Sequence, residues 1–579
     1  MANYHFYFAN RENVSRLFNR WDILLLILIF SILFLLSLAG KQMATPYALG
    51  TPLSISLAPS ELPFYALRTV LRLFIGLILS LIFSMIVGSL AAKSRRAELV
   101  IIPAMDILQS VPVLSFLAIT ITCFIRLFPN SLLGPECASI FVIFTAQVWN
   151  ITFSFYQSLK TLPHDLTEAA AMFQLSAWQR FWKIEVPFSM PGLLWNMMMS
   201  MSASWFFVVL SEAISVSHQS IRLPGVGSYI ALAIERQDLH AVGYAILTMM
   251  VVIFLYDQIL FRPLIAWSEK FKAEPSSDGS EYQSWLLSLI RRSRLLVEFN
   301  EQFSRLKNNF INPKRACQKG PSAIKEINVT HQKRLDWLWN GLLFLAIFAS
   351  GYLLLDYILS VLNPHDILRV LLLGAATGSR VIILIILSSL IWIPIGVWIG
   401  LRPRFAQKIQ PVIQFFAAFP ANLFYPLFVI AIVRFNLNVE IWITPLMILG
   451  TQWYILFNVI AGASSIPRDL YLVADNFGVK GWQWWRTLAL PGIFPFYITG
   501  AITAAGGAWN ASIVAEWVSW GNTTLKATGL GEYIQASTLS GNFPQIALGT
   551  SMMCIYVLIF NHFIWRPLYR LAEERFNFN

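Results

Sequence analysis

Residues 166–192 read LTEAAAMFQLSAWQRFWKIEVPFSMPG and place charged side chains between two long apolar stretches. The same skeleton returns 304 positions later, where residues 470–496 read LYLVADNFGVKGWQWWRTLALPGIFPF. Phe173 corresponds to Phe477 across this distance. Similarity at a fixed distance indicates two copies of one structural unit in the chain.

The repeat extends well beyond this segment. Residues 163–271 align without gaps with residues 467–575 at the distance of 304. Nearer the N-terminus the distance becomes 308, and the matched pairs are Thr69 with Thr377, Arg72 with Arg380, Gly88 with Gly396, Pro103 with Pro411 and Pro112 with Pro420. We therefore predict a first domain at 1–267, a linker at 268–335 and a second domain at 336–579.

The composition indicates a membrane protein. The 579 residues are 57% hydrophobic and 12% charged, whereas soluble domains have about 45–50% apolar and about 25% charged residues. Stretches of ~20 apolar residues predict transmembrane helices. The predicted spans are 22–39, 68–92, 100–128, 138–158, 190–211 and 241–261, then 337–361, 370–400, 409–433, 439–461, 492–515 and 545–565. We expect an all-α integral membrane protein with about 12 spans, as two tandem six-helix domains.

The positions of Lys and Arg predict the orientation, since cytoplasmic loops are enriched in these residues. Arg11, Arg16 and Arg20 precede the first span, so we expect a cytoplasmic N-terminus. Counting spans from there places the polar loops, at about 159–189 and 462–491, and the C-terminus in the cytoplasm. An even number of spans in each half makes the repeat parallel. The net charge of +12 then reflects topology, and we expect no nucleic-acid partner.

Two segments allow alternative interpretations. Small residues after the first apolar stretch would also suit a signal peptide, but cleavage would leave five spans in the first half, so we expect an uncleaved anchor. The linker holds 13 Lys or Arg against 7 Asp or Glu. Its residues 284–310 could form an amphipathic helix on the membrane surface or a flexible solvated linker, and the sequence favours neither.

No motif for catalysis is found. A nucleotide-binding P-loop requires G-x-x-x-x-G-K-[ST], and the Gly40-Lys41 pair lacks this spacing. Cys123, Cys137, Cys317 and Cys554 show no CxxC spacing, so no metal site is predicted. We expect a chain that is not an enzyme and holds no cofactor, with energy supplied by a partner or by an ion gradient.

Each polar loop is predicted to form a short helix, a turn and a proline-bounded return to the membrane. A short helix with one apolar face, held below the membrane in two copies, suits docking onto two soluble partners. The apolar face of the first helix would be formed by Ala169, Ala170, Ala171, Phe173 and Leu175.

Several motifs resemble a known family. The runs EAA at 168–170 and VADNFG at 473–478 resemble the EAA loop of binding-protein-dependent ABC importer permeases. The segments SEAISVSHQSIRLPGVGSYI and AEWVSWGNTTLKATGLGEYI are similar to the nitrate, sulfonate and taurine branch, in its duplicated form. The first loop departs from the family pattern at Gln174, where the family has glycine, and the second departs at Leu472, where the family has glutamate.

The resemblance implies a type I ABC importer fold in a bacterial inner membrane. The loop helices would be coupling helices that contact two copies of an ABC ATPase subunit, and ATP would be bound by those partners. The resemblance assigns this contact to Glu168, Ala169, Ala170, Phe173 and Gln174 in the first loop and to Ala474, Asp475, Phe477 and Gly478 in the second. An extracytoplasmic substrate-binding protein would deliver a small solute, such as nitrate, a sulfonate, taurine or bicarbonate. The alternative is a secondary transporter with twelve spans, which needs acidic coupling-ion ligands near the membrane midplane; Asp356 lies towards the outer end of its predicted span.

Three pairs of matched charged residues are candidates for the pathway or its gate. Arg72 and Arg380 lie inside predicted spans, where a charge indicates function or reaches the headgroups by snorkelling. The second and third pairs lie in or near the outward segments, and they are Glu212 with Glu516 and Arg222 with Lys526. The glutamates would gate the pathway or cap a helix turn, and the cations would steer an anion or be solvated loop charges.

Overall fold

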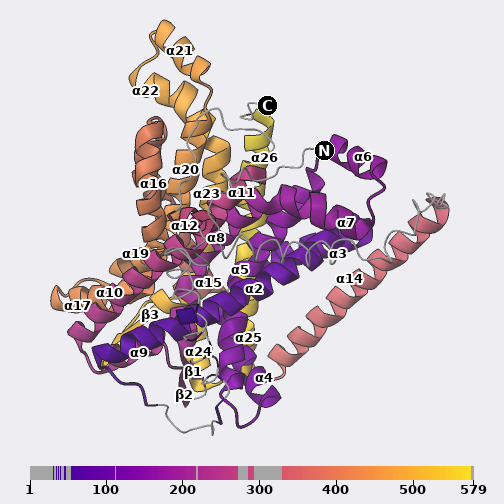
Figure 1. Cartoon of the computed structure of the whole chain (residues 1–579). Helices are drawn as coiled ribbons and strands as arrows, with labels where there is room; N and C mark the ends of the chain where they lie inside the picture. The colour runs from indigo at the N-terminus through magenta and orange to yellow at the C-terminus, as the bar shows by residue number, and fades with distance from the viewer. Residues whose placement is uncertain are drawn as a thin grey trace, which may run out of the picture. The chain divides into compact units, whose positions relative to one another are not determined.

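Figure 1 shows a computed structural model of the chain, which describes residues 54–110, 113–216, 219–271, 285–292 and 329–575 and a few positions between 30 and 46. These residues form helices and two short β-hairpins. The predicted span at 22–39 lies largely outside the described residues, as does most of the linker.

The first half contains helices and one β-hairpin, and the hairpin was not predicted from the sequence. Their bounds are η1 Pro59–Glu61, α2 Leu62–Lys93, α3 Arg95–Ser110, η2 Val113–Phe116, α4 Leu117–Leu127, α5 Leu133–Lys160, α6 His164–Met172, α7 Ala177–Arg180, η3 Phe181–Glu185, α8 Val186–Glu212, β1 Ala213–Val216, β2 Gln219–Arg222, α9 Val226–Glu235, α10 Leu239–Tyr256, η4 Asp257–Phe261, α11 Arg262–Ser268 and η5 Glu269–Phe271. The described part of the linker contains α12 Trp285–Arg292, a helix inside the segment 284–310.

The second half repeats this order. Its elements are α14 Val329–Leu359, α15 Pro364–Gly400, α16 Pro403–Ala418, η7 Ala421–Phe424, α17 Tyr425–Arg434, α18 Val439–Trp442, α19 Thr444–Ile448, α20 Gln452–Ser465, α21 Arg468–Asn476, α22 Gly481–Trp484, η8 Trp485–Ala489, α23 Leu490–Ala515, β3 Trp517–Trp520, β4 Thr523–Lys526, α24 Leu530–Ser540, α25 Phe543–Phe560, η9 Asn561–Trp565 and α26 Arg566–Arg575. Both hairpins are antiparallel, and Ala213 faces Arg222 as Trp517 faces Lys526.

Seven described helices are long and apolar enough to cross a membrane, or up to nine if each of two bent pairs counts as one span. The prediction of spans is therefore confirmed in kind, although the described residues do not provide all twelve. The predicted span 337–361 falls on α14, of which only Phe348–Leu359 qualifies as a shorter apolar helix.

The predicted span 100–128 is divided among α3, η2 and α4, and two further predicted spans are bent. The span 409–433 bends by 71° between Pro411–Ala418 and Ala421–Arg434, and Pro420 lies at the bend. The span 439–461 bends by 47°, whereas its counterpart α5 is continuous. Pro445 and Gly450 lie at the second bend, where α5 has residues that support a helix. Proline and glycine explain both breaks, since each disfavours a helix interior.

The chain divides into two compact units, which do not coincide with the two repeats. One unit contains Met1–Lys41, Gln157–Trp195 and Leu255–Glu326, and the other contains Gln42–Tyr156, Asn196–Phe254 and Ile327–Asn579. Within the second unit, α21 and α22 lie at one end of α23, and β3, β4 and α24 lie at its other end (Figure 1).

Parts of both repeats pack together inside the second unit. The Val113 backbone N–H donates to Asn510 Oδ1 (2.8 Å), and the Gly521 N–H donates to the Ile234 carbonyl oxygen (3.0 Å). An apolar cluster joins Ile121, Ala138 and Ile221 of the first half with Ile546 of the second. Burial of such side chains from water or lipid gives the close packing that holds the helices together.

Candidate functional site

The first polar loop begins with α6, and a left-handed turn ends this helix. Gln174 has φ +47°, a value that side chains other than glycine rarely adopt. The Gln174 N–H donates to Ala171 O (2.9 Å) and the Leu175 N–H donates to Ala170 O (3.0 Å). This pair of bonds is a Schellman motif, which satisfies carbonyl groups at a helix end.

The second loop forms the same turn with the residue type that suits it. Gly478 has φ +66°, its N–H donates to Asp475 O (3.0 Å), and the Val479 N–H donates to Ala474 O (2.9 Å). The departure from the family pattern at Gln174 therefore leaves the backbone unchanged. It costs strain instead, on the order of 1 kcal/mol for a residue other than glycine in this region.

Both loops expose apolar side chains beside a buried alanine. Ala170 and Ala474 are buried at matched positions, whereas Met172 is 85% exposed, Phe477 81% and Trp482 73%. The remaining predicted residues Glu168, Phe173, Gln174, Asp475 and Gly478 are also exposed, and Ala169 is half-buried. Exposed apolar patches of this kind mark sites for partners.

Different contacts hold the two loops in place. In the first, Ser176 Oγ accepts from the Gln179 N–H (3.2 Å) and the Ser176 N–H donates to Gln179 Oε1 (3.0 Å), which is a capping box. In the second, Lys480 provides no side-chain cap. Tyr471 instead donates to Ala463 O (3.3 Å), and burial raises the pKa of Tyr471 to about 12, so its hydroxyl stays protonated at neutral pH.

A π-helical segment follows each loop at matched positions, η3 in the first half and η8 in the second. Such segments are rare and are frequent at functional sites. Each leads into an apolar helix, and in the second half the helical stretch Gly481–Ala515 is continuous over 35 residues. At 1.5 Å per residue it extends about 50 Å from the loop to the opposite end of the bundle.

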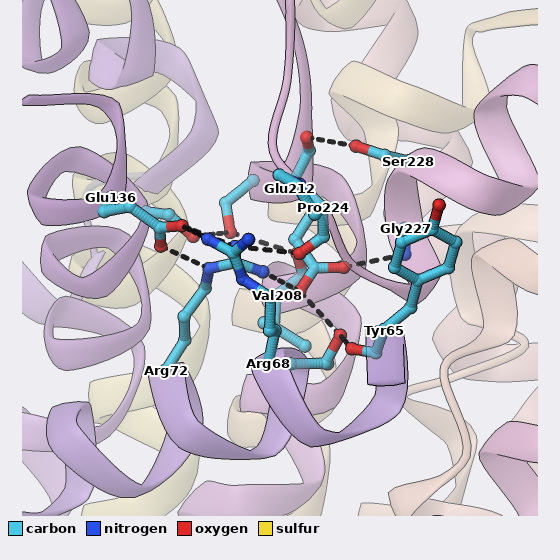
Figure 2. A network of polar contacts seen from close by, with 12 residues as sticks. Tyr65, Arg68, Arg72, Glu136, Val208, Glu212, Pro224, Gly227 and Ser228 are labelled. Atoms are coloured by element: carbon cyan, nitrogen blue, oxygen red, sulfur yellow. Dashed lines mark hydrogen bonds and ion pairs between the residues drawn. The ribbon is translucent and has the colours of Figure 1, made fainter. Parts of the chain in front are cut away.

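In the first half, a buried ion cluster includes Glu212, the last residue of α8 (Figure 2). Arg72 donates through Nε to Glu136 Oε2 (2.6 Å), through Nη2 to Glu136 Oε1 (2.8 Å), and through Nη1 to Glu212 Oε1 (2.5 Å). Arg68 donates to Glu136 Oε1 (2.7 Å). Arg72 and both carboxylates are 0% exposed, so two arginines and two glutamates form a buried set with balanced formal charges.

The same cluster fixes the segment after the hairpin. The Gly227 N–H donates to Glu212 Oε2 (2.7 Å), and the Val226 N–H donates to Thr69 Oγ1 (3.1 Å). A Cβ on Gly225 would overlap the Glu212 carboxylate, and one on Gly227 would overlap the Val209 carbonyl group. The G-x-G spacing is therefore needed because the backbone itself approaches the carboxylate.

The second half has a corresponding cluster. Arg380 pairs with Glu440, and its Nη1 donates to Glu516 Oε1 (2.9 Å). Thr377 donates to Glu516 Oε1 (2.9 Å), and the Gly531 N–H donates to Glu516 Oε2 (2.8 Å). The contacts of Thr69, Arg72, Glu136 and Glu212 thus recur at the matched positions.

The two clusters differ in charge and in exposure. The position matched to Arg68 is Ala376, so the second cluster contains one arginine and two glutamates. Arg380 is 12% exposed and Glu440 is 45% exposed. Water therefore screens part of the excess negative charge in the second cluster, whereas the first depends on its own arginines.

The other predicted pair of cations lies outside these clusters. Arg222, on β2, pairs with Glu235 (2.5 Å). Lys526, on β4, lies over the ring of Trp517, with its Nζ 4.0 Å from the ring centroid. Neither these contacts nor the pairing of Arg72 with Glu212 was predicted from the sequence.

Glu136 and Glu440 were not predicted. They are separated by 304 positions, so extending the gap-free alignment towards the N-terminus beyond residue 163 identifies them as a matched acidic pair. The distance between matched residues changes from 308 to 304 just before this pair, and this change conceals the match.

The described residues contain no group of three or more His, Cys, Asp or Glu that could hold a metal ion. Cys123, Cys137 and Cys554 are free thiols, and Cys317 lies outside the described residues.

Comparisons with known proteins agree with the repeat. Residues 80–262 and 392–573 each match the family described as binding-protein-dependent transport system inner membrane component. The two matches cover more than half of the chain, and each contains one polar loop and one G-x-G segment.

Three relatives are transport permeases. The chain is 25% identical to a nitrate import permease protein of Leptolyngbya laminosa over 32% of this chain and 63% of the relative. It is 26% identical to a bicarbonate transport system permease protein of Synechocystis sp. over 28% of this chain and 55% of the relative, and 24% identical to a taurine transport system permease protein of Escherichia coli over 32% and 64%. The chain therefore spans less than two thirds of each relative's length.

Proposed function

We propose, because this chain belongs to the family of binding-protein-dependent transport system inner membrane components, that it is the membrane-spanning permease of an ATP-driven importer with both permease halves in one chain. The two family matches and the relatives named above support a tandem permease. In this proposal the domains are 1–267 and 336–579, joined by the linker 268–335.

One observation carries the proposal. An exposed apolar surface occurs in each half, and each precedes a long helix that ends at a buried glutamate. Two ABC ATPase subunits would bind these surfaces, at residues 166–182 and 470–486. Closure of the ATPases around ATP would move the loops, and the helices that follow would carry the motion across the membrane.

The ion clusters would hold the C-terminal ends of these helices against the segments that follow the hairpins. In the second half, Glu516 directly follows α23 and holds the backbone of α24 through Gly531. A displacement of α23 therefore changes the position of α24 relative to Arg380 and Thr377. Arg72, Glu212, Arg380 and Glu516 would gate the pathway by this means rather than by presenting free charge to a solute.

The solute would be a small oxyanion such as nitrate, bicarbonate, a sulfonate or taurine, and the names of the three relatives support nitrate, bicarbonate and taurine. An extracytoplasmic substrate-binding protein would deliver it near the hairpins that carry Arg222 and Lys526. The loops and both chain termini would lie in the cytoplasm of a bacterium, with the chain in the inner membrane.

Uptake into proteoliposomes tests the proposal. The chain is reconstituted with its ATPase and binding protein, and accumulation of labelled nitrate, bicarbonate and taurine is measured. We expect uptake that requires ATP inside and persists when ionophores abolish ion gradients. Uptake that needs a gradient and ignores ATP would instead indicate a secondary transporter.

A further inference from the structure

A cavity lies beside the last helix of the second half, at the π-helical segment η9. Its volume is about 340 Å³, and it is lined by Ile502, Asn561, Trp565, Arg566, Tyr569 and Arg570. These residues come from α23, η9 and α26, which lie together in the second unit (Figure 1). The cavity is distinct from the ion clusters and from the exposed surface of the second loop.

Among the described residues, no ion-pair partner faces two cations of this cavity. Arg566 and Arg570 are exposed, and in the part of the chain that the structure describes neither forms an ion pair or a side-chain hydrogen bond. Their spacing of four residues places both guanidinium groups on one side of α26. Two such cations repel each other, so an anion between them would stabilise the arrangement.

The first half shows how the same position is neutralised. Arg262 corresponds to Arg566, and its Nε lies 3.3 Å from Asp257 Oδ2. Asp257 corresponds to Asn561, so the second half lacks the carboxylate that pairs with this arginine. The backbone is π-helical in both halves, at η4 and η9, so the chemistry differs while the local fold is shared.

Two further replacements change the second copy in the same direction. Tyr569 occupies the position of Ile265, and Arg570 occupies the position of Ala266. At these matched positions the first half has one arginine paired with one aspartate, whereas the second half has two arginines and an asparagine in place of the aspartate. Trp565 and Tyr569 add amphipathic rings, which prefer the boundary between membrane and water.

We propose that this cavity binds a phosphate-class oxyanion, and that the two arginines are its ligands. Guanidinium groups bind such anions through paired N–H donors, and the Asn561 amide can add a donor. The anion is carried either by the headgroup of an acidic phospholipid or by a free oxyanion in solution. This site is separate from the proposed ATPase surfaces and does not depend on the proposed transport cycle.

Binding of short-chain phosphatidylglycerol to the purified full-length chain in detergent tests the proposal. Saturable binding is expected, with short-chain phosphatidylcholine much weaker. Each basic residue near a membrane surface contributes a factor of about five in affinity. We therefore expect Arg566→Gln and Arg570→Gln each to weaken phosphatidylglycerol binding about fivefold. Asn561→Asp, which restores the carboxylate of the first half, should weaken it by a similar factor.

Arg575→Gln is the matched control, because it removes the same charge from α26 at an exposed position that does not line the cavity. It should change the affinity less than about twofold. Gel filtration and circular dichroism confirm that each variant is folded before binding is measured.

Inorganic phosphate distinguishes the two sources of the anion. Arginine-dependent binding of phosphate alone, with displacement of phosphatidylglycerol, would support a site for a free oxyanion. Binding of phosphatidylglycerol that millimolar phosphate does not displace would support a lipid site. Affinities for both ligands that are unchanged in Arg566→Gln and Arg570→Gln, or equally reduced in Arg575→Gln, would overturn the proposal.

Discussion

Replacing Arg72 with methionine removes the cation that contacts both Glu136 and Glu212. Arg72 donates three hydrogen bonds to these carboxylates and one to the Pro224 carbonyl oxygen. All three charged side chains are 0% exposed. Removing one partner of a buried ion pair costs about 3–5 kcal/mol, because the remaining charge stays buried. We expect Arg72→Met to lower the free energy of unfolding by about this amount.

The second half supplies the matched variant. Arg380→Met leaves Glu440, which is 45% exposed and still accepts from the Thr528 N–H (2.9 Å). Glu516 is 0% exposed and retains Thr377 and the Gly531 N–H. One charged hydrogen bond within a buried site contributes about 1.5–3 kcal/mol, so we expect a loss in that range, smaller than for Arg72→Met.

Reversible unfolding of the purified chain by SDS in mixed micelles, followed by circular dichroism, measures both losses. Adding Glu212→Gln to Arg72→Met should recover part of the stability, because a neutral amide replaces an unpaired carboxylate. Equal losses for the two arginine variants, or no recovery in the double variant, would refute the claim that the carboxylates of the first cluster are more buried and are neutralised by its own arginines.

Four further predictions concern the loops and the glycines. Gln174→Gly should raise the free energy of unfolding by up to about 1 kcal/mol, because it relieves the left-handed strain. Gly478→Asp should abolish uptake, while membrane insertion, measured by fractionation, remains intact. Gly225→Ala should prevent correct folding, measured by gel filtration, since its Cβ meets the Glu212 carboxylate, while Gly506→Ala, where a Cβ meets nothing within 4 Å, should fold normally. Phe477→Ala should weaken ATPase binding in a pull-down at least tenfold, as for a buried aromatic anchor of about 2 kcal/mol; an unchanged affinity would contradict the proposed surface.

Apolar stretches and the repeat predicted most of the helices because both are properties of the sequence alone. The span 68–92 lies within α2, and 370–400 lies within α15. The bend near Pro420 was missed because a hydropathy window averages over a proline. Prolines and glycines in one repeat but not in the other, such as Pro445 and Gly450, are the signal that separates a broken span from a continuous one.

The site was predicted only in part, because the repeat identifies matched positions but not their contacts in space. Matched positions identified Arg72, Arg380, Glu212 and Glu516 as candidates, but sequence distance does not show which charges meet. Thr69, Glu136 and the backbone N–H of Gly227 join the cluster only through the packing of α2, α5 and α9. The left-handed conformation of Gln174 was also not predicted, because glutamine rarely adopts it. Only the glycine at the matched position, Gly478, indicates this turn.

The central claim is that two loop surfaces couple the chain to ATPases, and affinity isolation tests it most directly. The tagged chain is extracted gently from its native membrane, and co-purified proteins are identified by mass spectrometry, for the unaltered chain and for the Phe173→Ser and Phe477→Ser variants. The account predicts that a P-loop ATPase accompanies the unaltered chain and is depleted in each variant. Recovery of the chain without such an ATPase, or equal recovery of the ATPase with all three chains, would contradict it.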